Sequence, residues 1–297
     1  MSPASIFFAP DGQLRPSWRA VVFVPLYVFL SLLVSGIVVF VIGGELRGNP
    51  ELSLAVGGML SLLVAVLAAK LLLRFLDRRD FRSLGFWFYA GWALELGVGL
   101  AGGLLLISLV VGVQWSLGGV EFVTLAATAP VLFAAAVWNL VMLLPAAASE
   151  ELLFRGYPFQ RLVEAWGAWP ATLVFAALFG ALHLWNPSPT ALSTLNTSLM
   201  GILLALAYLK TRGLWLPIGL HFAWNYALGF LYSLPLSGLR LEGILWQVEV
   251  AGPGWLTGGG YGPEGSLVTT LIALTAIIVL ARTRRLRLGS ASPPELQ

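Results

Sequence analysis

The chain has 297 residues, of which 58% are hydrophobic and only 10% are charged, and its mean hydropathy is +0.87. A composition this apolar excludes an ordinary soluble domain and predicts an integral membrane protein. The chain contains no cysteine, which excludes disulfides, thiol catalysis and cysteine-based metal sites.

Eight apolar runs are each long enough for a helix across the hydrocarbon core of a bilayer, which needs about 20 residues. In chain order they are residues 19–43, 53–76, 91–115, 124–147, 168–187, 190–210, 214–233 and 266–282. The sequence therefore predicts an all-α, polytopic membrane protein with eight transmembrane helices in a single domain, residues 19–282. The first run lacks the cleavage-site pattern of a signal peptide and is predicted to be a retained helix.

Three segments fall outside these runs. Residues 1–18 are predicted to form a cytoplasmic N-terminal tail, and residues 283–297 a basic cytoplasmic C-terminal tail. The longest polar stretch, residues 234–265, is rich in glycine and proline and is predicted to be an external loop.

The distribution of basic residues predicts the orientation in the membrane, because cytoplasmic loops carry an excess of Lys and Arg. If the N-terminus lies in the cytoplasm, the outside segments hold only Arg47 and Arg240 of the 17 basic residues. Both termini are therefore predicted to be cytoplasmic, in the cell membrane. The basic residues lie next to the membrane rather than among exposed aromatic residues, so the net charge of +3 does not indicate a nucleic-acid partner.

Two adjacent glutamates near the end of the fourth run are the first candidate for a functional site. An ionised side chain in the middle of a bilayer costs roughly 2.5 to 17 kcal/mol, so such residues are rare there. Positions i and i+4 share a helix face, so Glu151 is predicted to pair with Arg155. Glu150 keeps no such partner and is a candidate general base acting on water. Taken alone, the same pattern also fits a helix that ends at the membrane surface.

Histidine occurs only twice, as His183 and His221, each in an apolar run. An antiparallel hairpin turning near residues 166–167 would bring His183 to the depth of Glu150, in the cytoplasmic half of the bilayer. Asn225 lies one turn after His221 on the same face, and such a donor pair could stabilise an oxyanion. Each of these residues alone also fits an interhelical hydrogen bond, but together they favour one active site. Asn186 is a weaker candidate for the same site.

Three short motifs carry a family resemblance. They are Glu-Glu-x-x-x-Arg at 150–155, Phe-x-x-x-His at 179–183 and His-x-x-x-Asn at 221–225. In this order they resemble the motifs of the CAAX protease and bacteriocin-processing family of intramembrane glutamic endopeptidases, also called the Abi family, which includes CAAX prenyl protease 2. The resemblance covers about residues 130–232.

The resemblance implies hydrolysis of a peptide bond within the membrane by a water that Glu150 activates. It implies that His183 positions the water and that His221 and Asn225 stabilise the oxyanion, with Glu151 and Arg155 as supporting residues. The expected partners are a hydrophobic, membrane-tethered or prenylated protein or peptide and the lipid bilayer, with no nucleic acid.

Two alternatives stay open at this point. Glu150, His183 and His221 could instead hold a catalytic zinc ion with an open fourth position. We expect no cofactor, because there is no His-Glu-x-x-His motif and Asn225 is a better donor than zinc ligand. Polar residues among helices also build transporter sites or belong to non-catalytic scaffolds. The chain lacks the repeated halves that are typical of transporters.

Overall fold

The computed structural model describes residues 4–241 and 245–283. Its helices are α1 (Ala4–Phe7), α2 (Pro16–Gly48), α3 (Pro50–Leu72), α4 (Trp92–Ser116), α5 (Ala129–Arg155), α6 (Tyr157–Trp166), α7 (Ala168–Leu182), α8 (Ala191–Thr211), α9 (Trp215–Tyr226), α10 (Gly254–Thr257) and α11 (Leu267–Arg282). Short π or 3₁₀ segments are η1 (Leu73–Asp77), η2 (Phe81–Leu84), η3 (His183–Trp185), η4 (Ala227–Leu231), η5 (Gly259–Tyr261) and η6 (Pro263–Gly265). The strands are β1 (Val120–Thr124) and β2 (Trp246–Val250).

The expectation of a mostly helical, multi-pass membrane protein is confirmed. In the described part of the chain, six helical stretches are long and apolar enough to cross a membrane, and α11 is a shorter apolar helix. Each of the eight predicted runs overlaps a helix, but α9 has only 12 residues before η4 continues it. The count of eight crossings and the orientation with both termini inside stay predictions. Residues 1–3 of the predicted N-terminal tail and 284–297 of the C-terminal tail lie outside the described residues.

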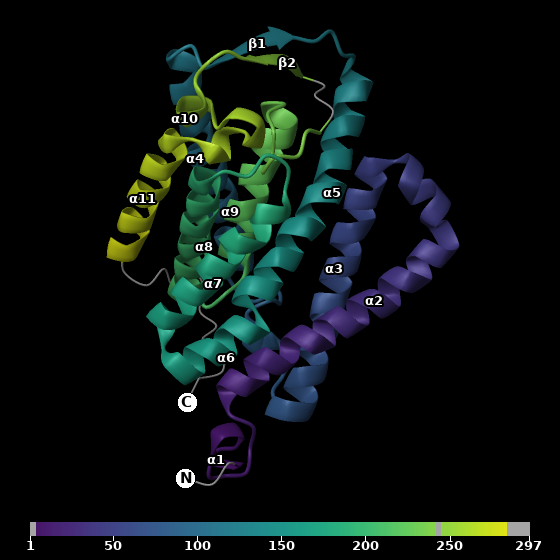
Figure 1. Ribbon diagram of the computed structural model, residues 1–297, viewed down its shortest axis with the longest axis vertical. Helices are drawn as coiled ribbons and strands as arrows, with labels where there is room; N and C mark the ends of the chain where they lie inside the picture. Colours follow the sequence, from purple (N-terminus) through teal and green to yellow (C-terminus); the bar gives the residue numbers. More distant parts are fainter. Residues whose placement is uncertain (1–3, 242–244, 284–297) are drawn as a thin grey trace.

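A small sheet that the sequence analysis missed lies at one end of the helical bundle (Figure 1). β1 and β2 pair in antiparallel register, with Phe122 opposite Val248. Both segments are short and rich in β-branched or aromatic residues, which favours a strand on a partly buried surface. The fold is thus mostly helical, as expected, with this one small sheet in addition. The fourth membrane helix, α5, begins at Ala129 rather than at residue 124, and β2 lies inside the stretch expected to be a loop.

Helices α4 and α9 approach so closely that only glycine fits at three positions of their interface. A Cβ atom on Gly99 would collide with the backbone of Leu216, and one on Gly103 with the carbonyl oxygen of Leu220. From the other side, a Cβ on Gly219 would meet the backbone of α4. Small residues let helix backbones pack closely in membranes, where burial of apolar surface gives little driving force. These contacts therefore fix the position of α9 relative to α4.

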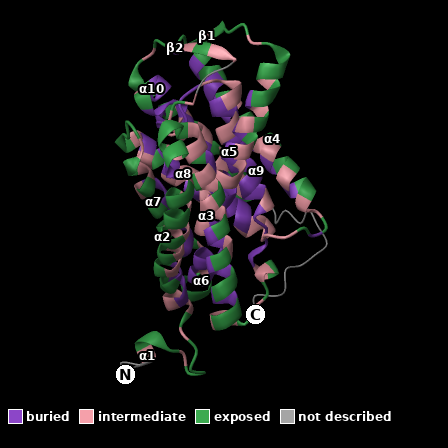
Figure 2. Cartoon of the chain, turned by 90° about the vertical axis from the view of Figure 1, so that its right-hand side faces the viewer, coloured by how far each residue is buried: buried purple, intermediate pink, exposed green. Residues whose placement is uncertain are grey.

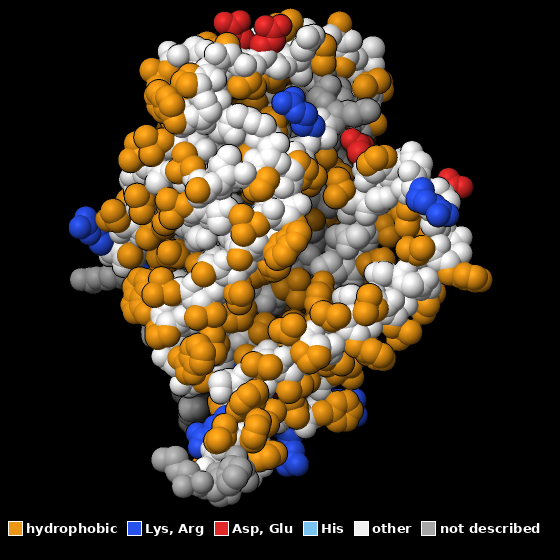
Figure 3. All heavy atoms as spheres, in the orientation of Figure 1, with side chains coloured by type: hydrophobic (Ala, Val, Ile, Leu, Met, Phe, Trp, Pro, Cys, Tyr) orange, Lys and Arg blue, Asp and Glu red, His pale blue; other side chains and the backbone are white. Residues whose placement is uncertain are grey.

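The outer surface of the bundle is apolar. Exposed residues follow the outward sides of the helices, whereas buried residues lie inside the bundle (Figure 2). Among the exposed side chains are Phe40, at 91% exposure, and Trp185, at 80%. Hydrophobic side chains cover the broad face in Figure 3, and charged side chains lie mostly toward its ends and edges. An apolar surface of this extent fits contact with lipid rather than with water.

Candidate active site

A cavity of about 410 Å³ is lined by residues of α3, α5, α7, α8, α9 and α11, of the short segments η3 and η6, and of the loops that follow η3 and η4. A volume of this size is typical of ligand pockets. Five of the seven polar candidates from the sequence line it, namely Glu150, His183, Asn186, His221 and Asn225, whereas Glu151 and Arg155 do not. Most of the other lining residues are apolar. The structure thus brings these five candidates together in one pocket, although they come from separate segments of the chain.

Glu151 and Arg155 form the ion pair expected from their spacing on α5. Arg155 Nη1 lies 3.0 Å from Glu151 Oε1, and both side chains are almost completely buried. Arg155 also donates through Nη2 to the carbonyl oxygen of Gly201 on α8, at 2.9 Å. The pair therefore ties α5 to α8 next to the pocket.

Glu151 has a second partner that the sequence analysis missed. His221 Nδ1 on α9 lies 2.8 Å from Glu151 Oε1. Because an ionised carboxylate only accepts hydrogen bonds, His221 donates through Nδ1 and keeps Nε2 toward the pocket. His221 Nε2 lies 3.8 Å from Glu150 Oε2. Glu151 thus orients the histidine ring toward its neighbour Glu150.

The two glutamates differ in environment as well as in partner. The Glu151 side chain is fully buried, whereas the Glu150 side chain keeps 36% of its surface accessible. The Oε2 atoms of both glutamates are buried without a hydrogen-bond partner among the described residues, but Glu151 Oε1 accepts from Arg155 and His221. Glu150 is therefore the carboxylate that is open to a molecule in the pocket.

His183 is fixed through its Nδ1 atom, which lies 2.7 Å from the carbonyl oxygen of Phe179. A carbonyl oxygen accepts only, so Nδ1 carries the proton and Nε2 is left as an acceptor in the neutral ring. The Phe179 ring contacts the rings of His183 and His221, with centroids 4.7 and 6.1 Å apart. The Arg155 guanidinium lies 4.9 Å from the centroid of the same ring. Phe179 therefore packs against three of the polar side chains.

The expected helix over residues 168–187 ends early. α7 stops at Leu182, η3 follows, and Asn186 is extended, with φ −72° and ψ 160°. Asn186 precedes Pro187, and the residue before a proline is disfavoured in the helical region. Asn186 Nδ2 donates to the carbonyl oxygen of Ser237, at 3.0 Å. The side chain lines the pocket and also ties the loop after α7 to the loop after α9.

The expected simple hairpin between the fourth and fifth helices is also wrong. The chain does turn at Gly167, but α5 ends at Arg155 and α6 is inserted before the turn. Arg161 of α6 is 1% exposed and lies 3.2 Å from Asp77, rather than projecting from the bundle. α6 therefore packs into the protein through a buried ion pair.

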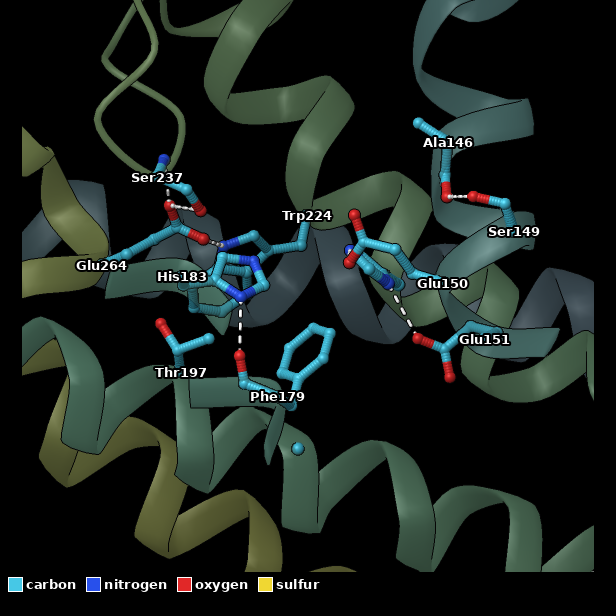
Figure 4. A network of polar contacts seen from close by, with 12 residues as sticks. Ala146, Ser149, Glu150, Glu151, Phe179, His183, Thr197, Trp224, Ser237 and Glu264 are labelled. Atoms are coloured by element: carbon cyan, nitrogen blue, oxygen red, sulfur yellow. Dashed lines mark hydrogen bonds and ion pairs between the residues drawn. The ribbon is translucent and has the colours of Figure 1, made fainter. Parts of the chain in front are cut away.

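Glu264 is a second carboxylate in the pocket that the sequence analysis missed. Its oxygens accept hydrogen bonds from Trp224 Nε1 at 3.1 Å, from Ser237 Oγ at 2.8 Å and from the Ser237 backbone N–H. Asn196 Nδ2 holds the Glu264 carbonyl oxygen at 2.8 Å. In Figure 4, His183 lies between Glu264 on one side and Glu150 on the other. The C-terminal part of the stretch expected to be an external loop thus folds back into the site.

Glu264 belongs to η6, outside the six candidate membrane spans. Burial raises the pKa of its carboxyl above the ordinary value, whereas the Ser237 donors, His183 and the Trp224 donor act in the opposite direction.

Within residues 4–241 and 245–283, no group of three or more His, Asp or Glu side chains has the geometry to hold a metal ion. His221 uses Nδ1 for Glu151, and its Nε2 atom lies 3.8 Å from Glu150 Oε2.

Comparison with known families gives one match. Residues 130–227 match the family model described as type II CAAX prenyl endopeptidase, Rce1-like. The matched segment begins in α5, ends at the first residue of η4 and contains all three sequence motifs. The resemblance to the CAAX protease family is thus confirmed over this segment. Comparisons with curated proteins and with solved structures gave no match.

Proposed function

We propose, from the match of residues 130–227 to a type II CAAX prenyl endopeptidase family, that this chain is an intramembrane endopeptidase. Its substrate is a membrane-tethered or lipid-modified protein or peptide, with prenylated peptides as the class that the family name suggests. One observation carries the proposal: the Glu150 side chain, which is 36% exposed, places its Oε2 atom 3.8 Å from His221 Nε2 in a pocket lined mostly by apolar side chains.

In this mechanism Glu150 acts as the general base. It takes a proton from a water molecule, and the water oxygen forms a bond to the carbonyl carbon of the scissile peptide. The carbonyl electrons move to the oxygen, which becomes an oxyanion. When the C–N bond breaks, the leaving nitrogen takes the proton from Glu150, so the products are a carboxylic acid and an amine. General base catalysis of this kind contributes about 10² to 10⁴ in rate.

The other pocket residues hold the reacting atoms. The free Nε2 atom of His183 accepts a hydrogen bond from the attacking water, because Nδ1 is engaged by Phe179. With both ring nitrogens protonated, His221 donates to Glu151 through Nδ1 and to the oxyanion through Nε2. Asn225 supplies a second donor from the same face of α9. Donors fixed before the reaction stabilise a developing oxyanion without reorganising.

The proposed enzyme needs no metal and works in the cell membrane, with its site in the cytoplasmic half of the bilayer. The positive-inside distribution of Lys and Arg supports this orientation. The metal-free mechanism is supported by Glu151 and Asn225, because Glu151 accepts a hydrogen bond from His221 and Asn225 would donate one to the oxyanion. Zinc content of the purified protein, measured together with activity in a strong chelator, tests it. One zinc per chain and loss of activity in chelator would favour a metalloprotease instead.

Proteomics of membrane fractions tests the proposed activity without a known substrate. Cells that produce the wild-type protein are compared with cells that produce Glu150→Gln, and new protein termini are identified by mass spectrometry. We expect at least one terminus in a membrane protein that depends on Glu150. Identical termini in both samples would contradict the proposal and would favour a transporter or a non-catalytic scaffold.

A further inference from the structure

Glu264 lines the pocket although it lies between β2 and α11, outside the segment that matches the peptidase family. Its carboxylate is occupied by hydrogen bonds from Trp224 and Ser237 (Figure 4). Oε1 accepts from Trp224 Nε1 at 3.1 Å, and Oε2 accepts from Ser237 Oγ at 2.8 Å and from the Ser237 backbone N–H. Glu150 Oε2, in contrast, has no hydrogen-bond partner among the described residues. Glu264 is therefore placed to hold neighbouring groups rather than to act on a substrate.

The bond from Trp224 acts on the helix that carries the two oxyanion donors. Trp224 is 3% exposed and lies on α9, three residues after His221 and directly before Asn225. Side chains within one helical turn keep fixed directions relative to one another. A hydrogen bond from Trp224 Nε1 to a group outside the helix therefore limits the rotation of α9. It helps to set the directions in which His221 and Asn225 point.

The bonds from Ser237 act on the loop that follows His183. Asn186, three residues after His183, donates through Nδ2 to the carbonyl oxygen of Ser237 at 3.0 Å. The next residue, Gly238, packs so closely on Pro187 that a Cβ would lie 2.0 Å from the Pro187 carbonyl oxygen. The loop after α7 and the loop after η4 are thus fastened to each other. Because Glu264 accepts two bonds from Ser237, it holds this joint from the third side.

Glu264 is itself held from behind. Asn196 Nδ2 on α8 donates to the carbonyl oxygens of Glu264 and Ser266, at 2.8 and 2.7 Å. A Cβ on Gly262 would lie 2.2 Å from the carbonyl oxygen of Pro235, so this stretch also packs tightly on the loop before Ser237. A residue can position catalytic groups only when its own conformation is fixed by its surroundings. Glu264 meets this condition.

We propose that Glu264 is a positioning residue for peptide-bond hydrolysis. Through Trp224 it aligns the two donors on α9, and through Ser237 it aligns the loop next to His183. The role depends on acceptor oxygens, and a carboxyl group keeps acceptor capacity whether it is ionised or protonated. This inference rests on the proposed peptidase function. It extends the working site into a segment beyond residues 130–227.

A double-mutant cycle on cleavage of a membrane-tethered peptide in proteoliposomes tests this role. Trp224→Phe removes the indole donor, and Glu264→Gln leaves one side-chain acceptor oxygen for three donors. We expect each to lower kcat about tenfold with little change in KM, since a misplacement of about 1 Å costs about 100-fold and the aligned groups act in the transition state. The double variant should be no slower than the slower single variant, because both changes break the same contact.

Trp138→Phe is the matched control. It removes a similar bond, from Trp138 Nε1 to Glu51 Oε2 at 2.9 Å, but Trp138 does not line the pocket. It should keep the wild-type kcat. Thermal unfolding shows which fraction of each variant is folded. If Glu264→Gln does not fold, Ser237→Ala removes the Oγ donor alone and takes its place in the cycle with Trp224→Phe.

Amide hydrogen exchange gives a second readout that needs no cleavage. The Ser237 backbone N–H donates to Glu264, so its exchange should be faster in Glu264→Gln than in wild type and in Trp138→Phe. Unchanged exchange would overturn the inference. So would a wild-type kcat in Trp224→Phe, a raised KM with unchanged kcat, or effects that multiply in the double variant.

A further outcome would also contradict a positioning role. If Glu264→Gln cleaves as slowly as Glu150→Gln, Glu264 takes part in proton transfer itself. Failure of the proposed function has a different signature. The wild type then cleaves no membrane-tethered peptide, although Ser237 still exchanges faster in Glu264→Gln.

Discussion

Replacing Glu151 by leucine should destabilise the protein strongly, because it leaves the buried Arg155 without its counter-charge. Arg155 and Glu151 are 1% and 0% exposed and lie 3.0 Å apart. Removing one partner of a buried ion pair costs about 3–5 kcal/mol, since the remaining charge stays out of water. For a chain of this size such a loss corresponds to a fall of roughly 6–15 °C in the midpoint of thermal unfolding.

The double variant Glu151→Leu/Arg155→Met separates stability from function. Replacing a buried pair with apolar residues of similar volume is often neutral or stabilising, so most of the lost stability should return. Activity should not return, because His221 has lost the acceptor that fixes Nδ1. We expect a kcat at least about 100-fold below wild type for the double variant, as when a base or donor is misplaced.

Unfolding of the wild type and of both variants is followed by thermal scanning in the same detergent, and cleavage is measured on the folded fractions. A Glu151→Leu variant as stable as wild type would refute the buried ion pair. A stable double variant with wild-type activity would refute the role of Glu151 in orienting His221.

Three further variants test the fold around the site. Gly103→Val should push α9 away from α4 and lower the activity at least about tenfold. Gly112→Val is the control on the same helix and should stay active, because a Cβ there meets open space. Equal activities of the two variants would contradict the close contact between α4 and α9. Phe179→Ala should destabilise the protein by about 3–5 kcal/mol in thermal unfolding, as for other buried aromatic residues, and a change below 1 kcal/mol would show that its packing is unimportant. Asn196→Leu removes the hydrogen bonds to the carbonyl oxygens of Glu264 and Ser266. It should lower the free energy of unfolding by about 1–3 kcal/mol and speed up amide hydrogen exchange in the residues next to Glu264 and Ser266. Unchanged exchange would contradict the role of Asn196 in holding this segment.

The sequence predicts those features that follow from local geometry. The i, i+4 spacing on one helix is sufficient to pair Glu151 with Arg155, and the polar residues stand out because they occur in apolar runs. The approximate positions of the membrane helices follow from run length alone. These predictions need no knowledge of how distant segments pack.

The features that were missed depend on contacts between distant segments. Glu151 and His221 are 70 residues apart, and Ser237 and Glu264 are 27 apart, so no helical periodicity connects them. Glu264 follows a proline in a polar, glycine-rich stretch, where a single acid is unremarkable. Its carboxylate becomes part of the pocket only because Asn196 and Ser237 hold that stretch against the helices.

Cleavage by purified protein in proteoliposomes tests the central role of Glu150 most directly. A membrane-tethered peptide is incubated with the wild type, with Glu150→Gln and with Glu249→Gln, which changes an exposed glutamate on β2. Products are identified by mass spectrometry, and thermal unfolding confirms that all three proteins are folded. We predict the same cleavage by wild type and Glu249→Gln and a rate at least about 100-fold lower for Glu150→Gln. Cleavage by folded Glu150→Gln at the wild-type rate would contradict the account.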